Sequence, residues 1–540
     1  MSRIQRIFAW GAFSLVAMLL TGWLFADYLT PPSVGAPGHA LAIPDAGEPC
    51  KQTRLDKEVA PLVARHGGKT GALLIPDGLD AFSARALATR QAGRSLDLQY
   101  YIWHDDLTGR LLAHEVWEAA ERGVQVRILL DDMANSGDDA GLLALAAHRN
   151  IEIRLYNPIR NRGGIFRVLE LVQRIYSVNH RMHNKQWIAD GRVAILGGRN
   201  IGEEYFDAST ETNFRDLDVL VFGPKVAQAS KIFDDYWNSK AVVPVSALVD
   251  PSPDAMQHLL VKSEQEARRS DARRYYARMD ASSTVRSYFS KGLTPFWTNS
   301  IEVVSDPPLK WKEDEDRSGW LLTRLIDEIK KTTHKALLIS PYFVPGDDTA
   351  NGLVLLASNH KAFVGVITNS LAANDVPAVH SGYADYRDRL LQGGVRLYEM
   401  RANVPVKGSK HRQSGGKQGA GSGGRMLGSS GASLHTKAFL IDDRRGFIGS
   451  FNLDPRSAYL NTEMGVLFDD PAISAALRNE YLHLASPRVS YWVSHDANGD
   501  LRWLDRTAKP PVLINHEPET TKTQRVIAEI LRWLPIESQL

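Results

Sequence analysis

The sequence lacks a pair of cysteines and lacks a strong net charge. Cys50 is the only cysteine among its 540 residues, so no internal disulfide can form, and the chain is compatible with a reducing or an oxidising compartment. Its 64 basic and 62 acidic residues give a formal net charge of +2. Because a dedicated nucleic-acid binder is usually more strongly basic, this balance disfavours that class, and no nucleic-acid partner is expected.

Charged residues are also missing from one long stretch near the N-terminus. Arg3 and Arg6 precede an uncharged run over residues 7–26, which is just long enough to cross ~30 Å of hydrocarbon as a helix. A cleaved secretory signal and a retained anchor both fit this pattern. The run exceeds a typical signal core and no small-x-small site follows it cleanly, so we favour a transmembrane anchor within residues 1–27. The basic end then lies in the cytoplasm and the rest of the chain outside it.

The remaining chain predicts two α/β halves joined by a connector. Residues 28–68, rich in proline and glycine, predict a tether. Residues 69–250 alternate strands with helices, and residues 301–490 repeat that order after a connector at 251–300. Alternation of this kind is typical of largely parallel sheets that are covered by helices on both faces.

The two halves carry the same motif at the same spacing. Each copy has a histidine, a lysine two residues later, an aspartate five residues after the lysine, and an asparagine after a glycine-rich turn. The copies are His183, Lys185, Asp190 and Asn200, and His435, Lys437, Asp442 and Asn452. Identical offsets in a chain with a 252-residue period predict an internal duplication.

These residue types suit the chemistry of a phosphate diester. An imidazole can attack phosphorus or donate a proton, whereas an ammonium and an amide can hold negative charge that develops on oxygen. On a strand, His183 and Lys185 would project from the same face. Asn200 follows paired glycines, where backbone and amide can both approach a ligand closely.

Both copies match the pattern His-x-Lys-x4-Asp-x6-Gly-(Gly/Ser)-x-Asn, and the chain thereby resembles the phospholipase D superfamily. The run Tyr100-Tyr101-Ile102-Trp103 and the closing stretch at residues 534–540 resemble bacterial cardiolipin synthases in particular. The resemblance implies two phospholipase D-like α/β sandwich domains, with mixed or parallel sheets, about a pseudo-twofold axis. It also implies one shared active site, because two histidines must act on opposite sides of one phosphorus.

The resemblance assigns roles to the motif residues. The histidines and lysines are catalytic, and Asn200 and Asn452 bind substrate phosphate. It also counts Asp190 and Asp442 in the catalytic motif, although their position in turns indicates a structural role.

A carboxylate beside each motif is expected to orient the histidine. By spacing, Glu463 should hold His435 and Asp216 should hold His183; the second match is weaker, since five extra residues separate that histidine from its carboxylate.

The function implied by the resemblance is phosphatidyl transfer through a phosphohistidine, with His183 as nucleophile, His435 as acid and base, and no metal or other cofactor. The expected substrates are phospholipids, namely phosphatidylglycerol with phosphatidylethanolamine as a further donor. The expected location is the bacterial inner membrane with the catalytic domains on the periplasmic side. Hydrolytic phospholipase D activity and a metal-independent nuclease are the alternatives.

Two further segments leave their roles open. Residues 401–433 form a basic, glycine-rich stretch that predicts either a disordered loop or a mobile flap contacting anionic headgroups. The C-terminal extension at residues 491–540 contains an amphipathic helix, which could lie on a membrane interface or dock on the protein core.

Overall fold

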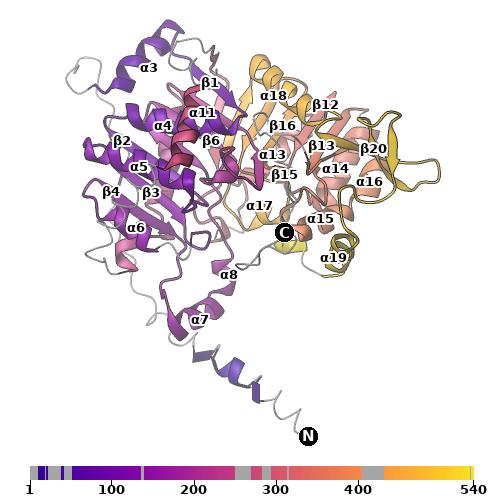
Figure 1. The fold of residues 1–540 in the computed structure, drawn as a ribbon, viewed down its shortest axis with the longest axis horizontal. Coiled ribbons are helices and arrows are strands. Elements are labelled where there is room, and N and C mark those ends of the chain that lie inside the picture. The colour runs from indigo at the N-terminus through magenta and orange to yellow at the C-terminus, as the bar shows by residue number, and fades with distance from the viewer. Residues whose placement is uncertain are drawn as a thin grey trace.

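The computed structural model describes residues 10–11, 13–18, 20–21, 38–39, 41, 52–135, 139–249, 269–281, 294–312, 316–359, 361–403, 431–534 and 537–540. The chain folds into two halves, each built on one large sheet with helices against it (Figure 1).

The sheet of the first half has nine strands. In spatial order they are β10 (Phe296–Thr298), β1 (Thr70–Ile75), β8 (Asp218–Phe222), β6 (Val193–Gly197), β5 (Gln186–Ala189), β2 (Ser95–Tyr100), β3 (Gln125–Asp131), β4 (Ile151–Tyr156) and β9 (Val242–Pro244). Only the neighbours β2, β3 and β4 are parallel.

The sheet of the second half has ten strands. Their order is β11 (Ile301–Ser305), β18 (Met464–Asp469), β17 (Arg445–Gly449), β16 (Lys437–Ile441), β12 (Lys335–Ile339), β13 (Phe363–Asn369), β14 (Arg396–Met400), β19 (Ser490–His495), β20 (Leu501–Asp505) and β21 (Val512–Ile514). Again one central trio, β12, β13 and β14, is parallel.

The two sheets repeat one topology. The run β1-β8-β6-β5-β2-β3-β4-β9 in the first half has the same arrangement as β11-β18-β17-β16-β12-β13-β14-β19 in the second. The predicted pair of α/β domains is therefore confirmed. Of the mixed or parallel sheets that were expected, the structure has mixed ones, because the first strand after each histidine, β5 or β16, runs antiparallel to its neighbour in the parallel trio.

Helices cover both sheets. Those of the first half are α3 (Arg54–Arg65), α4 (Gly78–Gln91), α5 (Leu107–Glu121), α6 (Asp139–Ala146), α7 (Gly164–Gln173), α8 (Ile175–Val178), α9 (Val226–Trp237) and α11 (Ser270–Ala281). The later ones are α13 (Leu321–Lys330), α14 (Gly346–Ser358), α15 (Pro377–Ala384), α16 (Arg387–Gln392), α17 (Pro455–Tyr459), α18 (Pro471–Leu484) and α19 (Lys522–Arg532). Aspartates at the N-caps start several of them, because each carboxylate accepts otherwise unpaired N–H groups of the first turn.

A shared apolar core joins the halves. Its buried members include Met182, Val219 and Phe233 from the first half, and Leu337 and Val466 from the second. Since burying apolar surface is the main favourable contribution to association, this cluster holds the halves together. The ends of the strands that carry the motifs meet at the same junction.

Some segments differ from the sequence-based boundaries. The predicted tether at 28–68 contains helix α3, and the predicted connector contains α11, which packs on the first half through Tyr275 against Phe82. Strands β19 to β21 attach most of the C-terminal extension to the second sheet. Of the basic segment at 401–433, residues 404–430 lie outside the described residues.

The expected membrane anchor is described only in part, at residues 10–11, 13–18 and 20–21. Among the residues that the structure describes, no helix is both long enough and apolar enough to span a membrane.

Candidate active site

The two motif histidines lie where the halves meet. His183 precedes β5 rather than lying within a strand, and its backbone N–H donates to the carbonyl of Thr462 at 2.9 Å. His435 precedes β16, and its backbone N–H donates to the carbonyl of Arg215 at 2.7 Å. Each histidine is thus fixed by backbone of the opposite half. The parallel pair β7 (Thr212–Arg215) and β15 (Gly431–Leu434) makes the same kind of connection.

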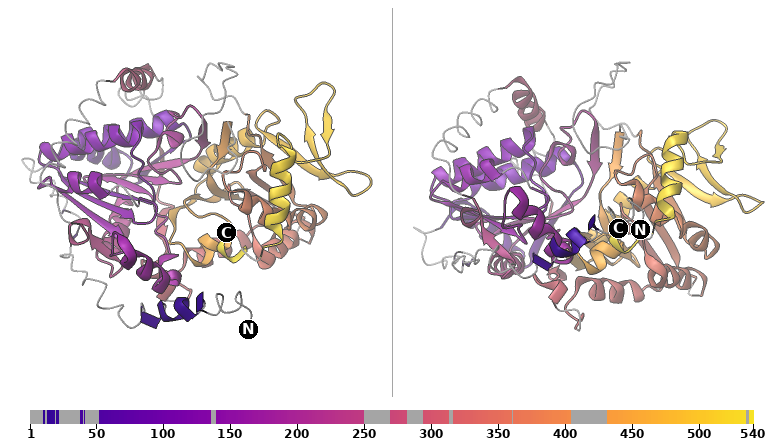
Figure 2. Two further views of the ribbon diagram at one scale, coloured as in Figure 1. Left: turned by 60° about the horizontal axis from the view of Figure 1, so that its bottom comes forward. Right: turned by 90° about the horizontal axis from the view of Figure 1, so that it is seen from below.

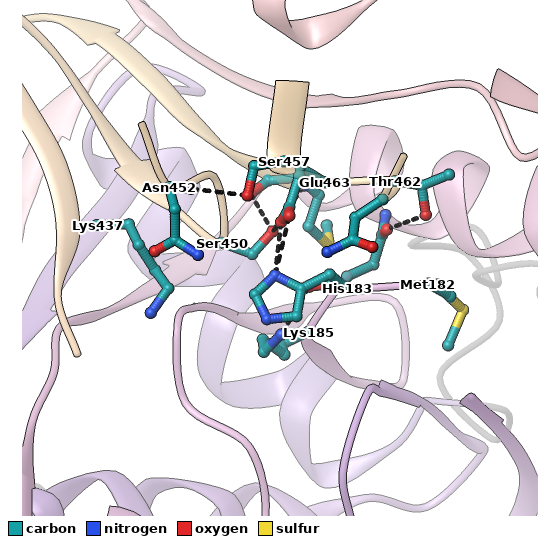
Figure 3. A network of polar contacts seen from close by, with 12 residues as sticks. Met182, His183, Lys185, Lys437, Ser450, Asn452, Ser457, Thr462 and Glu463 are labelled. Carbon is teal, nitrogen blue, oxygen red and sulfur yellow. Dashed lines mark hydrogen bonds and ion pairs between the residues drawn. The ribbon is translucent and has the colours of Figure 1, made fainter. Parts of the chain in front are cut away.

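Each imidazole is oriented by a carboxylate from the opposite half. His183 Nδ1 lies 2.8 Å from Glu463 Oε2, and His435 Nδ1 lies 2.5 Å from Asp216 Oδ2 (Figure 3 shows the first pair). The pairing predicted by spacing, Glu463 with His435 and Asp216 with His183, is therefore wrong. The backbone bonds of His183 to Thr462 and of His435 to Arg215 place each histidine beside the carboxylate that comes next in sequence, Glu463 or Asp216.

This pairing fixes the tautomer of both rings. Because the carboxylate accepts a hydrogen bond from Nδ1–H, the proton of each neutral imidazole stays on Nδ1 and the free lone pair is on Nε2. In Figure 3 the far nitrogen of His183 points away from Glu463 and toward the side where Lys185 and Lys437 lie. A histidine in this state can attack an electrophile through Nε2.

The two lysines bring positive charge from both halves into one site. Both side chains are buried, and their Nζ groups donate to the carbonyls of His183 (2.7 Å) and His435 (2.6 Å). Burial lowers the pKa of Lys437 to about 8, although Asp216 and Glu463 act in the opposite direction. Burial also lowers the pKa of Lys185.

Electrostatics couple the two histidines. Burial lowers the pKa of His183 well below its usual value, and both lysines add to the effect. Burial lowers the pKa of His435 to about 4, and Lys437 adds to this while Asp216 opposes it. Each imidazole senses the lysines of both motifs, so the two copies form one site.

The two carboxylates have opposite pKa shifts. Burial raises the pKa of Glu463 to about 7, against the influence of Lys185 and of the Ser450 hydroxyl. Burial also acts to raise the pKa of Asp216, but His435 and Lys437 outweigh it and leave that pKa below its usual value.

The asparagines of the two copies differ in their contacts. Asn200 Oδ1 accepts from the N–H of Ile102 at 3.2 Å, and its Nδ2 donates to the Tyr205 hydroxyl at 2.9 Å. The side chain of Asn452 makes no hydrogen bond among the described residues, and its Oδ1 is buried. Its Nδ2 can therefore donate to a ligand oxygen, whereas the side chain of Asn200 is engaged by protein.

The motif aspartates are outside the catalytic site. Asp190 accepts the N–H groups of Gly93, Arg94 and Ser95 just before β2. Asp442 does the same for residues 333–335 before β12. Both lie at the end of the motif strand opposite its histidine, so their hydrogen bonds favour the structural role over inclusion among the catalytic residues.

Sequence reasoning left out several neighbours of the histidines. The Tyr101 ring meets His183 edge-on at 5.1 Å, and Phe214 stacks on His435 at 5.2 Å. The Ser450 hydroxyl donates to Glu463 and lies within the motif turn. Tyr101 belongs to the Tyr-Tyr-Ile-Trp run of the first half, which is the signal that could have drawn attention to it.

One other group has the composition of a metal site. His104, Asp106 and Glu204 offer ligand atoms within 4.8 Å of one another in the described part of the chain. Asp106 already caps α5 through the N–H of Gly109 and accepts from the N–H of Glu203. The group adjoins the first motif but supplies no atom to the histidine pairs.

The family follows from a comparison with known proteins. A family model described as "Cardiolipin synthase, PLD-like domain" matches residues 88–237 and 325–485, which is more than half of the chain and includes both histidines. The chain belongs to this family. Membership in the cardiolipin synthase, phospholipase D-like family makes it a phospholipase D-type phosphatidyltransferase, as the sequence predicted.

Individual relatives agree with the family. Cardiolipin synthase C of Escherichia coli is 37% identical over 486 residues, which are 90% of this chain and 99% of that protein. Cardiolipin synthase 2 of Staphylococcus epidermidis is 24% identical over 413 residues, covering 75% of this chain and 66% of that protein. The crystal structure of phosphatidylserine synthase from Haemophilus influenzae Rd KW20 has a TM-score of 0.54 at 12% identity, covering 89% of this chain and all of that one, and shares the fold.

Proposed function

We propose that this protein transfers a phosphatidyl group from one phospholipid to phosphatidylglycerol and so makes cardiolipin. The observation that carries the proposal is the pair of crossed histidine–carboxylate contacts, His183 with Glu463 and His435 with Asp216, beside two buried lysines. This arrangement supplies a nucleophile, a proton donor and fixed positive charge around one phosphorus atom.

In the first step, His183 Nε2 attacks the phosphorus of the donor lipid. The new N–P bond forms as the bond to the headgroup oxygen breaks, and protonated His435 gives its proton to the departing alkoxide. Asp216 is ionised and favours the imidazolium form of His435. The pKa of His435 is only about 4 beside Lys437, so its protonation also requires the negative charge of the donor phosphate, which raises that pKa when the lipid binds. The low pKa of His183 favours a neutral ring and therefore supports its role as nucleophile.

In the second step, a glycerol hydroxyl of phosphatidylglycerol attacks the phosphohistidine. Neutral His435 takes the hydroxyl proton, the new O–P bond forms and the N–P bond breaks, so that His183 and protonated His435 are both restored. Lys185, Lys437 and Asn452 bind the nonbridging oxygens during both steps. The two ammonium groups provide the charge for which other phosphoryl-transfer enzymes use a metal ion.

Phosphatidylglycerol and phosphatidylethanolamine are the proposed donors, and the bacterial inner membrane is the proposed location. Residues 7–26 would anchor the chain with its catalytic halves on the periplasmic side. The uncharged character of that run and the two arginines before it support this orientation.

The test is a transfer assay with the purified full-length protein in vesicles, in the presence of excess chelator. We expect cardiolipin and free headgroup alcohol, measured by mass spectrometry, when phosphatidylglycerol is present. Phosphatidic acid alone would indicate a hydrolase and contradict transfer. Cleavage of DNA with no turnover of lipid would instead support the nuclease alternative.

A further inference from the structure

Apolar side chains are exposed on two helices, one in each half. On α7 of the first half, Ile165 is 57% and Phe166 52% exposed, and Val168 is exposed beside them. On α19, Val526 and Ile530 are exposed, as are Trp533 and Leu534 directly after the helix, with Trp533 at 83%. Isolated exposed apolar residues are common on proteins, but clusters of large ones mark an interaction surface.

Helix α7 is held firmly while it exposes these groups. The buried carboxylate of Glu170 accepts from the N–H groups of Arg160 (2.9 Å) and Asn161 (2.8 Å), and from the Arg174 guanidinium (2.8 Å). The exposed apolar side chains therefore belong to an anchored helix. Its first turn follows Gly163-Gly164, so Ile165 and Phe166 stand at an end of the helix.

Helix α19 is likewise docked by one face only. Its inner side packs on α15, where the Ser381 hydroxyl donates to the carbonyl of Ala528 at 2.8 Å, and Arg532 pairs with Asp385. The exposed residues at 526, 530, 533 and 534 recur at helical spacing and form one apolar stripe. A docked helix with such a stripe has the form of a helix that lies in a membrane interface.

Both helices lie on the same side of the molecule. Figure 1 draws α7 and α19 along the lower side, on different halves, with α18 on the upper side. The described N-terminal residues lie beside α7 in Figure 1, and the left view of Figure 2 shows them at the same edge of the molecule. Of the four arginines at residues 160–174, Arg162 and Arg174 pair with Asp132 and Glu170. Arg160 and Arg167 add positive charge near α7, which suits a surface of anionic lipid.

We propose that α7 and α19 form a two-point membrane-docking face that seats the catalytic halves on the lipid leaflet. The proposal rests on the proposed function for its choice of partner, a phospholipid surface. Helix α7 ends ten residues before His183, and the C-terminus that follows α19 contacts α17, where the Arg456 N–H donates to the Leu540 carbonyl. Insertion of these two helices brings the site to the depth of the headgroups.

The test places a fluorescent label on each helix in the full-length protein. Cys50, the only cysteine, is replaced by serine, and single cysteines are introduced as Phe166→Cys, Ile530→Cys and, as a matched control, Leu482→Cys. Leu482 is an apolar residue of α18 that is 58% exposed. The labelled proteins are reconstituted in vesicles of phosphatidylglycerol and phosphatidylethanolamine.

We expect nitroxide groups on the acyl chains to quench the labels at 166 and 530 about twofold or more, and aqueous iodide to quench only the label at 482. Equal access of iodide to all three labels would overturn the proposal, as would a lipid-quenched label at only one of the two helices. If acyl-chain nitroxides quench neither label in these protein-free vesicles, the exposed helices do not bind a lipid surface and a protein partner becomes the alternative.

The same measurement on a His183→Ala background separates this proposal from the proposed function, because it needs no turnover. The double variant Phe166→Asn/Ile530→Asn should lower transfer in vesicles about tenfold, whereas Leu482→Asn should retain it. If the labels on both helices contact lipid but the parent protein transfers no phosphatidyl group, only the proposed function is contradicted. If the parent transfers phosphatidyl groups but the labels do not contact lipid, only the docking face is contradicted.

Discussion

Each histidine–carboxylate pair joins the Nδ1 of one half to a carboxylate of the other half, but the two pairs differ in chemistry. His183 is paired with a glutamate whose pKa is raised to about 7 by burial, whereas His435 is paired with an aspartate whose pKa lies below its usual value. In the first copy of the motif turn, a Cβ at Gly198 would lie 2.5 Å from Asp216 Oδ1. In the second copy, Ser450 occupies that place and donates its hydroxyl to Glu463.

This difference shows how a duplicated motif can support two roles. An ionised carboxylate stabilises a cationic imidazole, which is the form that a general acid requires. A neutral imidazole is the form that a nucleophile requires. Burial lowers the pKa of both imidazoles, but at His435 the ionised Asp216 acts against this, which suits that ring as acid and base. At His183 both lysines add to the lowering, which suits a neutral ring that attacks phosphorus.

The largest expected effect comes from neutralising the carboxylates. Glu463→Gln and Asp216→Asn should each lower kcat by about 100- to 10,000-fold, because an amide can hold the imidazole in the wrong tautomer. With an activated aryl phosphodiester the loss should persist in Glu463→Gln and shrink in Asp216→Asn, because an aryl leaving group departs without a proton. Single-turnover kinetics with both substrates measure this difference. If the loss instead shrinks in Glu463→Gln and persists in Asp216→Asn, His435 is the nucleophile and His183 the acid and base.

A smaller effect is expected from the asparagines. Asn452→Ala should lower kcat by about 100-fold, because its amide is available to the phosphate oxygens. Asn200→Ala should instead reduce the free energy of unfolding by about 1–3 kcal/mol, since it leaves the Ile102 N–H and the Tyr205 hydroxyl unpaired. Steady-state kinetics and thermal unfolding separate the two. Equal losses of kcat at equal stability would show that the copies bind phosphate alike.

The turn aspartates should behave alike in both halves. Asp190→Ala and Asp442→Ala each remove an acceptor of several backbone N–H groups, so each should cost about 1–3 kcal/mol in unfolding free energy. The kcat of the folded fraction, measured after active-site titration below the unfolding temperature, should stay within about threefold of the parent. A large fall in kcat with unchanged thermal stability would contradict the structural role and show that these aspartates take part in catalysis.

The smallest effect is a dependence of stability on pH. The pKa of Glu463 is raised in the folded state, so its contribution is complete below the unfolded pKa, near 4.5, and is lost as pH rises through about 7. Stability of Glu463→Gln relative to the parent should therefore increase between pH 5 and pH 8, by roughly 1–3 kcal/mol. Denaturant titrations at several pH values measure this change.

The matched control for this pH dependence is Asp216→Asn. The lowered pKa of Asp216 means that its contribution is present above the unfolded value and is lost only in stronger acid. The stability of Asp216→Asn relative to the parent should therefore be constant between pH 5 and pH 8. A constant difference for Glu463→Gln, or a change for Asp216→Asn, would contradict the assigned carboxylate states.

The duplicated motif was enough to predict the two halves, their α/β class and the set of histidines and lysines at one site. The equal offsets after His183 and His435 carried that information, because they require equivalent strands and turns. The position of Asp190 and Asp442 in turns after the motif strands also indicated a structural role, which their hydrogen bonds to backbone N–H groups favour.

The partner of each histidine could not be predicted from distance along the chain. Glu463 follows His435 closely in sequence, but the pseudo-twofold junction places it against His183. Contacts between the two duplicated halves depend on how the halves pack against each other. The spacing of residues within one half does not reveal that packing. The choice between a mixed and a parallel sheet was left open for a related reason, because the direction of a buried strand cannot be read from its apolar pattern alone.

The most direct test of the central claim is to trap the covalent intermediate. The His183→Ala and His435→Ala variants are incubated with an activated aryl phosphodiester, quenched, digested and analysed by mass spectrometry. In His435→Ala, His183 can still attack and the aryl group can leave unprotonated, so a phosphohistidine adduct should accumulate on His183. In His183→Ala no adduct should form. An adduct on His435 in His183→Ala, with none in His435→Ala, would contradict the assignment.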